Sequence, residues 1–220
     1  LVLTDAHQTD HVYLRTVLQE RIARHAGLRI LSDHRIDFQV PALAPLGPDL
    51  ILFNGEVLEW DDTRATYPVR DMRSTPIMVI EITSPSTRQK DLTDKPPLFW
   101  RAGVRLYYIV DGPSGSGEAG RILAYEAGRR EYEALPLENG RAWLEVVNLW
   151  LGLENGHARL YEEDGTPIEN YTGIVRQRNA ETQRANAEAE RLFAVVIQIA
   201  EQHARRRSAG RVVATNAVDD

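Results

Sequence analysis

The 220-residue sequence contains no cysteine, which excludes disulfides, thiolate metal sites and cysteine nucleophiles. This absence fits a reducing compartment, so we expect a cytoplasmic protein. No apolar run is long enough to span a bilayer and the first residues do not resemble a signal peptide, so we expect no membrane partner. Basic residues are fewer than acids, 26 against 32, which argues against a surface coated for non-specific nucleic-acid binding but not against a local basic groove.

What the chain does contain is an ordinary globular composition, 43% hydrophobic and 26% charged, and a length sufficient for one sizeable core with an appendage. We expect the body over residues 1–171 and a C-terminal helix with a tail over residues 172–220. From about 173 to 207 the composition shifts to Ala, Glu, Arg and Gln without proline. The apolar spacing there is that of a coiled-coil seam, which predicts a homodimer; a helix lying on its own domain is the alternative. The seam consists of Ala185, Ala189, Leu192, Val196, Ile199 and His203.

Two short apolar runs, residues 48–53 and 76–87, read as buried strands. One acid interrupts each run, Asp49 in the first and Glu81 in the second. An ionised carboxylate is costly in such surroundings unless it is paired, hydrogen-bonded or bound to a cation. Two such acids on adjacent strands could share one metal ion, although Asp49 could also simply cap a turn.

The N-terminal region predicts a helix from Asp10 to about His25, with Asp10 as N-cap. His11 falls on the same face as the apolar residues Leu14 and Leu18, so it faces the body of the protein. It is either a histidine at the edge of the core with a satisfied hydrogen bond or a helper at an active site.

Residues 28–40 alternate well enough to be one strand, and residues 49–54 form the next. Residues 56–75 are polar, show no lasting period and predict a surface excursion that could face a substrate. Three arginines in this excursion are candidates for touching a nucleic-acid backbone: Arg64, Arg70 and Arg73.

A helical segment separates the strands expected at residues 77–83 and 105–111, which makes a β-α-β unit with a parallel strand pair. Ser86 and Gln89 match a capping box at the start of that segment. Because Pro96 and Pro97 are not tolerated inside a helix, we expect Asp94 to cap a second short helix that runs to about residue 102. Further on, residues 122–126 and 131–135 are expected to form a hairpin around Gly128, and residues 143–147 another strand, with the apolar residues 149–151 after it.

Hydrolysis of a phosphodiester needs a hard cation, a positioned water and a cationic group near that water. Mg²⁺ prefers oxygen ligands and keeps several waters, so Asp49 and Glu81 would suffice to hold it, and Mn²⁺ is an alternative. Lys95 and Lys90 are the candidates for the cationic group. The hydroxyls just after the second strand are expected to act as caps first, although a helix N-terminus can also receive a phosphate. That candidate phosphate-binding group comprises Ser84, Ser86, Thr87 and Arg88.

Pro48-Asp49 followed by the buried run Glu81-Ile82-Thr83 resembles the PD-(D/E)XK nuclease superfamily. One branch of it, the Uma-type restriction endonucleases, is similar over a longer stretch. The similarity is close over residues 48–111 and looser over 10–47 and 121–171. The residues that carry it are the run 81–87, Asp91, Lys95, the tripeptide 102–104 and the strand 107–111.

The resemblance implies an α/β fold, a restriction-endonuclease-like mixed sheet flanked by helices. It also implies Mg²⁺-dependent cleavage of DNA, with Asp49 and Glu81 as metal ligands, the Ile82 carbonyl as a third, and a catalytic lysine. This sequence has Thr83 where the superfamily has that lysine, so the basic role moves to Lys95 on the following helix.

On a continuous helix Arg88, Asp91 and Lys95 would share one face, and Asp91 is a candidate accessory residue or a surface partner of one of these cations. The two prolines after Lys95 disfavour the continuous helix that this shared face requires.

Three functions stay open at this point. The first is a metal-dependent endonuclease acting on DNA. The second is a nuclease-fold protein that has lost catalysis and serves as an interaction or nucleic-acid-binding module, which the acidic composition and Thr83 favour. The third is a metal-dependent hydrolase of a smaller substrate. Metal binding and cleavage assays discriminate among them.

Overall fold

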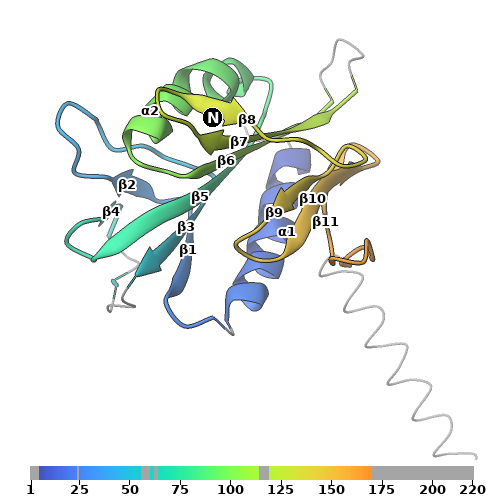
Figure 1. Cartoon of the computed structure of the whole chain (residues 1–220), viewed down its shortest axis with the longest axis horizontal. Coiled ribbons are helices and arrows are strands. Elements are labelled where there is room, and N and C mark those ends of the chain that lie inside the picture. The colour runs from blue at the N-terminus through green and yellow to red at the C-terminus, as the bar shows by residue number, and fades with distance from the viewer. Residues whose placement is uncertain (1–4, 24, 56–59, 62–63, 114–118, 170–220) are drawn as a thin grey trace, which may run out of the picture. The chain divides into compact units, whose positions relative to one another are not determined.

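The protein was analysed as a computed structural model that describes residues 5–23, 25–55, 60–61, 64–113 and 119–169 (Figure 1). The described residues belong to one compact unit over Leu1–Asn170. The predicted coiled-coil seam and the homodimer that it implies fall outside the described residues. Within the described part of the chain, no helix is both long enough and apolar enough to cross a membrane.

The centre of the fold is a six-stranded mixed sheet with the order β1-β3-β5-β6-β7-β8. Strands β5 and β6 are parallel, as the β-α-β pattern predicted, and the other neighbouring pairs are antiparallel. The strands of this sheet are β1 (Leu28–Ser32), β3 (Leu50–Gly55), β5 (Ser74–Ile82), β6 (Leu106–Asp111), β7 (Arg121–Ala127) and β8 (Tyr132–Ala134).

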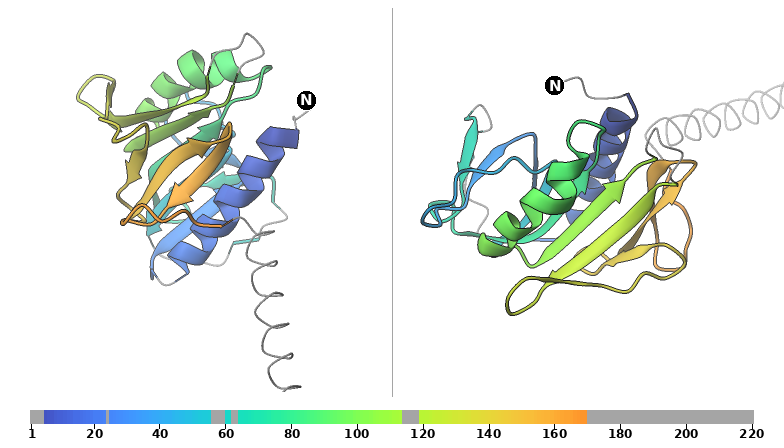
Figure 2. Two further views of the ribbon diagram at one scale, coloured as in Figure 1. Left: turned by 90° about the vertical axis from the view of Figure 1, so that its right-hand side faces the viewer. Right: turned by 90° about the horizontal axis from the view of Figure 1, so that it is seen from above.

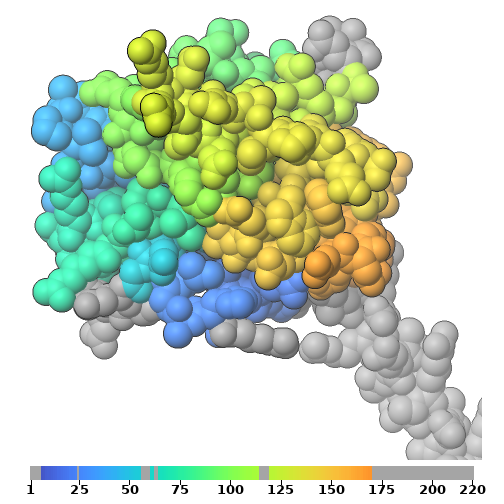
Figure 3. Space-filling model, viewed as in Figure 1, coloured from blue at the N-terminus to red at the C-terminus, as the bar shows by residue number. Residues whose placement is uncertain are grey.

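Both faces of this sheet are covered, which explains why its central strands are nearly continuous apolar runs. Helix α2 (Lys95–Arg101) lies on one face, and helix α1 (Asp5–Ile22) with a three-stranded sheet lies on the other (Figures 1 and 2). Alternate residues of β5 serve the two cores: Ile80 packs on the α1 side and Val79 on the α2 side. The three-stranded sheet consists of β9 (Ala142–Leu144), β10 (Leu149–Glu154) and β11 (His157–Tyr161). In Figure 3 the yellow to orange residues of these later strands cover the right-hand part of the face.

Helix α1 begins at Asp5, so the prediction that Asp10 is its N-cap was wrong. Asp10 lies inside the helix, is only 6% exposed and accepts a hydrogen bond from Nδ1 of His157 at 3.0 Å. That partner is distant in sequence, so only the tertiary fold shows why an acid is tolerated there. The predicted inward face was correct, because His11, Leu14 and Leu18 are all buried.

Residues 28–40 are not one strand but two, β1 and β2 (Arg35–Asp37), because Asp33 turns the chain with a left-handed φ of 59°. The predicted surface excursion also carries order. Within it β4 (Thr66–Pro68) pairs in parallel with β2, and Tyr67 is fully buried in the core on the α2 side. The strand-like alternation was missed because, among the described residues of the excursion, it is confined to Tyr67 and Val69.

The segment after β5 is one continuous helical stretch rather than two capped helices. Residues 88–89 are helical, η1 (Lys90–Asp94) is a π-helical turn, and α2 follows directly. Asp94 makes no side-chain capping hydrogen bond, and Gln89 donates to Thr93 instead of completing a capping box with Ser86. The wider π turn lies just before Pro96 and Pro97, which cannot donate the amide hydrogen bonds of an α-helix.

Candidate active site

Asp49 and Glu81 face each other across the antiparallel pair β3 and β5. Leu50 lies opposite Ile80, so the next position outward places Asp49 opposite Glu81. Two hydrogen bonds lock this arrangement: the Ile82 amide donates to Oδ2 of Asp49 at 2.7 Å, and the Asp49 amide contacts Oε2 of Glu81 at 3.3 Å. The two predicted acids are therefore brought together at the end of the sheet.

Glu81 is fully buried, and its Oε1 has no hydrogen-bond partner among the described residues. Burial raises the pKa of Glu81 well above its usual range, and the charge of Asp49 adds to this effect, whereas Lys95 opposes it. A buried carboxylate oxygen without a donor is a position where a cation would lower the energy. Asp49 differs: burial acts to raise its pKa, but hydrogen bonds from His7 and from the Ile82 amide hold the pKa below its usual value.

Lys95 reaches this acid pair from α2. Its Nζ lies 2.9 Å from Oε2 of Glu81 and 2.8 Å from Oδ1 of Asp91. Burial disfavours the charge of Lys95, but the carboxylates of Glu81 and Asp91 raise its pKa above the ordinary value, so the amine stays protonated. Asp91 is 1% exposed and so is not the surface partner that the sequence allowed. Its backbone carbonyl accepts a hydrogen bond from the hydroxyl of the buried Tyr107.

Two histidines of α1 approach the acids from the other side of the sheet. Nε2 of His7 lies 3.5 Å from Oδ2 of Asp49, and Nε2 of His11 lies 3.1 Å from the Asp49 carbonyl oxygen. The hydrogen bond to Asp49 raises the pKa of His7 against the effect of burial, and a further hydrogen bond joins His7 to the Ile82 backbone. Sequence reasoning missed His7 because it began the helix at Asp10, although His7 and His11 are four residues apart and share a helix face.

A second ionic cluster ends the neighbouring strand. Asp111 is only 2% exposed and accepts hydrogen bonds from Nε and Nη2 of Arg88, at 2.8 and 2.9 Å. Arg121 donates to the same carboxylate at 3.2 Å and Thr83 at 3.1 Å. Arg88 therefore pairs with Asp111 rather than with Asp91 as the helical spacing suggested.

The predicted phosphate-binding hydroxyls contact one another. Oγ of Ser84 lies 3.1 Å from Oγ of Ser86 and 3.0 Å from Oγ1 of Thr87, and Thr87 also accepts the Ser84 amide hydrogen bond. These contacts lie within the turn before the helix and do not show the predicted capping of the helix, and the phosphate role stays a prediction.

The three arginines of the excursion were candidates for contacts with a nucleic-acid backbone. Along the chain they lie in the segment that connects β3 to β5. Arg73 precedes Ser74, the first residue of β5, whereas Glu81 is close to its last residue. At 3.3 Å per residue these positions are roughly 25 Å apart. Arg64 lies over the ring of Trp60, 5.5 Å from its centroid, and Arg70 follows β4. The structure does not bring Arg73 to the acid pair.

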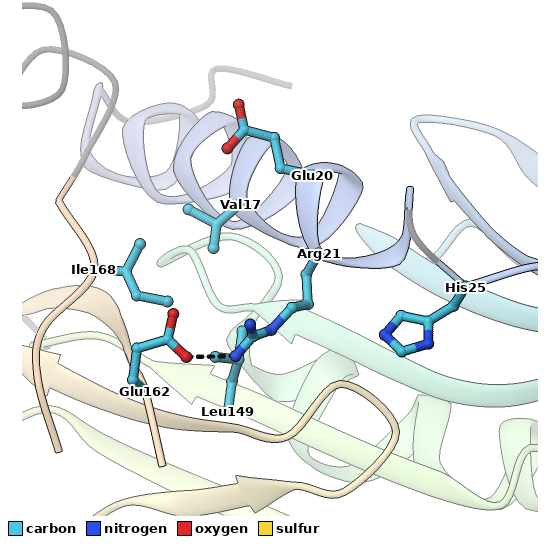
Figure 4. A pocket seen from close by; sticks show the side chains of 7 residues that line it. All are labelled: Val17, Glu20, Arg21, His25, Leu149, Glu162 and Ile168. Atoms are coloured by element: carbon cyan, nitrogen blue, oxygen red, sulfur yellow. Dashed lines mark hydrogen bonds and ion pairs between the residues drawn. The ribbon is translucent and has the colours of Figure 1, made fainter. Parts of the chain in front are cut away.

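A pocket of about 260 Å³ lies beside the acids, with His7, Ile82 and Arg88 in its lining. A larger one, about 470 Å³, lies between α1 and the strands β10 and β11 (Figure 4). There Arg21 and Glu162 reach toward each other and form an ion pair. The smaller pocket is the one that adjoins the acid pair, because His7 and Ile82, which contact Asp49, are in its lining.

The residues around Glu81 fit a hard, oxygen-ligated cation such as Mg²⁺ or Mn²⁺ better than a metal that prefers nitrogen or sulfur ligands. Within the described ranges, no group of three or more histidine, aspartate or glutamate side chains is arranged to hold a metal. Two carboxylates with a backbone carbonyl nevertheless match the oxygen-only, partly hydrated coordination that Mg²⁺ prefers. The Oε1 atom of Glu81, buried without a donor, supports the same assignment.

Comparison with known proteins identifies a family whose model matches this chain. The family model Uma2, described as "Putative restriction endonuclease", matches residues 2–158. A crystal structure described as a putative nuclease belonging to DUF820 from Anabaena variabilis ATCC 29413 is similar at 15% sequence identity. It aligns over 63% of this chain and 75% of that chain with a TM-score of 0.45. The search of the curated proteins found no match.

Proposed function

The chain belongs to the Uma2 family of putative restriction endonucleases, and on that premise we propose that it is a Mg²⁺-dependent endonuclease that hydrolyses phosphodiester bonds of DNA. The observation that carries this proposal is the convergence of Asp49, Glu81 and the Lys95 amine, which lies 2.9 Å from Glu81. Asp49, Glu81 and the Ile82 carbonyl would hold the ion. A bound Mg²⁺ supplies stabilisation of the negative charge that develops on the phosphate.

Lys95 has the role of orienting the attacking water and stabilising negative charge. The carboxylates of Glu81 and Asp91 keep its amine protonated, so it acts as a cation and hydrogen-bond donor and not as the base that removes a proton. The chain has only two lysines, Lys90 and Lys95, and Lys90 is exposed. Lys95 on the helix thus takes the role of the lysine that the superfamily has at the position of Thr83.

His7 acts on Asp49 rather than on the substrate. It contacts Oδ2 of Asp49, the oxygen that also accepts the Ile82 amide, so neither contact uses the other oxygen, Oδ1. A histidine that fixes the orientation of a metal-binding carboxylate is a common outer partner of a metal site.

The test is a plasmid nicking assay with Mg²⁺ or Mn²⁺ on the wild type, on Glu81→Ala and on Glu133→Ala, which removes an exposed acid of β8 as a control. We expect metal-dependent nicking that Glu81→Ala loses and Glu133→Ala keeps, with thermal unfolding confirming that both variants fold. Metal binding without nicking would favour a hydrolase of a smaller substrate. Neither binding nor nicking would favour the inactive module.

A further inference from the structure

The pocket beside the acid pair contains a positive region that the proposed metal chemistry does not use. His7 and Ile82 line the pocket near the acids, whereas Arg88 lines it elsewhere, with Thr83 and Ser84 also contributing. Its volume of about 260 Å³ is smaller than that of most pockets for whole ligands or cofactors. It therefore suits a short segment of a polymer better than a free small molecule.

The charge of this region comes from an unequal cluster. Asp111 binds Arg88 through two parallel hydrogen bonds and also binds Arg121, so one carboxylate faces two guanidinium groups. The carboxylate is inside, with its side chain 3% exposed, whereas 34% of Arg88 and 58% of Arg121 are exposed. Both arginines share this one carboxylate, and both reach the surface, where a ligand can contact them.

We propose that Arg88 and Arg121, held in place by Asp111, form a subsite for a phosphate of the DNA backbone next to the phosphate that is cleaved. Asp111 is the positioning residue of this subsite, because it touches the arginines and not the DNA. This inference rests on the proposed function, since it takes DNA as the substrate. A guanidinium suits this role because its fixed fork of donors matches the oxygens of a phosphate.

Other ionic groups nearby do not offer the same chemistry. Asp10 also lines the pocket, but it accepts a hydrogen bond from His157. At the opposite end of β6, Arg105 pairs with two carboxylates, those of Glu126 and Glu145, so that cluster has an excess of negative charge. Arg105, just before β6, is therefore a matched control: an arginine that is also ion-paired, but with two carboxylates.

The experiment measures binding of a short DNA duplex in the presence of a chelator, so that the metal-dependent reaction cannot proceed. We expect Arg88→Ala to weaken binding about tenfold to a hundredfold, the range for a lost hydrogen bond to a charged group. The slope of log affinity against log salt should fall by about 0.9, the value for one phosphate contact. Arg121→Ala should act in the same direction, and Arg105→Ala should leave both quantities unchanged.

Two further variants separate positioning from charge. Asp111→Asn raises the net positive charge, so it would strengthen binding if charge alone mattered; we expect weaker binding, because the arginines lose their anchor. Arg88→Lys keeps the positive charge but lacks the forked set of guanidinium donors. We therefore expect it to lose most of the DNA binding that Arg88→Ala loses. Thermal unfolding and metal binding identify any variant that fails to fold.

The inference is overturned if the wild type does not bind the duplex, or if Arg88→Ala binds like Arg105→Ala. The failure of the proposed nuclease would look different. In that case duplex binding would still depend on Arg88, but no divalent metal would produce nicking.

Discussion

Two ionic clusters lie at the same end of the two central parallel strands, and their compositions are opposite. At the end of β5, Asp49, Glu81 and Asp91 surround a single Lys95, whereas at the end of β6 one Asp111 serves Arg88 and Arg121. The first cluster has a surplus of carboxylates and attracts a cation. The second has two guanidinium groups on one carboxylate, which suits contact with an anion.

The two clusters also differ in burial, and this difference suggests a division of labour. Glu81 and Asp91 are almost inaccessible, so the acid cluster suits an ion that is stripped of part of its water. Arg121 and Arg88 are much more exposed, so the basic cluster suits a phosphate that remains at the surface of a polymer. Cleaving a phosphodiester requires both, because the substrate has to be held where the cation acts.

The largest effect is expected at Lys95, whose amine contacts both Glu81 and Asp91 in the acid cluster. Lys95→Met should lower metal-dependent nicking by about a hundredfold to a thousandfold, the range for removing one group that stabilises developing charge. It should also lower the free energy of unfolding by about 3–5 kcal/mol, because Glu81 and Asp91 remain buried without their partner. Nicking rates and urea unfolding measure the two effects.

The matched control for this prediction is Lys90→Met, which removes the exposed lysine of the same helical stretch. It should change neither nicking nor stability by more than a small amount. Equal losses in the two lysine variants would show that the position of Lys95 in the acid cluster is unimportant.

The next effect is expected at His7, which positions Asp49. His7→Gln should weaken binding of Mg²⁺ or Mn²⁺ by about tenfold to a hundredfold, the range for removing a group that orients a metal ligand. Isothermal titration with the metal alone measures this, and nicking at saturating metal should recover most of the wild-type rate. His25→Gln, which changes an exposed histidine beyond the end of α1, serves as the control. Unchanged metal affinity in His7→Gln would remove this residue from the site.

The acid pair could be predicted from the sequence because strand periodicity and burial are local signals. An acid in each of two apolar runs is visible without a structure, and the register that places Asp49 opposite Glu81 follows from the pairing of those runs. The need for a cationic group limited the choice to Lys90 and Lys95, the two lysines of the sequence, and the family resemblance then favoured Lys95. Its geometry depends on the π turn η1, whose extra residue per turn leaves no periodic trace in the sequence.

The basic cluster could not be predicted, because its members come from three separate elements. Asp91 lies three residues after Arg88 and four before Lys95, both of which are helical spacings, and local pairing rules therefore favoured Asp91 as the partner of both. In the fold, Asp91 instead forms an ion pair with Lys95, and Asp111 forms one with Arg88. His7 is a different case: the spacing to His11 was present in the sequence, but the helix start was placed too late.

The smallest effect is expected from the charge of Asp111 on stability. Burial acts to raise its pKa, but Arg88, Thr83 and Arg121 together hold the pKa below its ordinary value of 3.8. A group with a lowered pKa stabilises the fold above the ordinary pKa and loses that contribution as the pH falls through the folded-state pKa. Asp111→Asn should therefore be less stable than the wild type by about 1 kcal/mol at pH 7, the difference between a charged and a neutral hydrogen bond.

This stability gap should stay constant from pH 7 to about pH 5 and shrink below the ordinary pKa of 3.8. Urea unfolding of both proteins across this range measures it, and comparing the two proteins cancels the other acids that they share. A gap that persists unchanged at pH 3 would mean that the shape of the aspartate, and not its charge, stabilises the cluster. In that case Asp111 would hold the two arginines through its shape, and the contrast in charge between the two clusters would matter less.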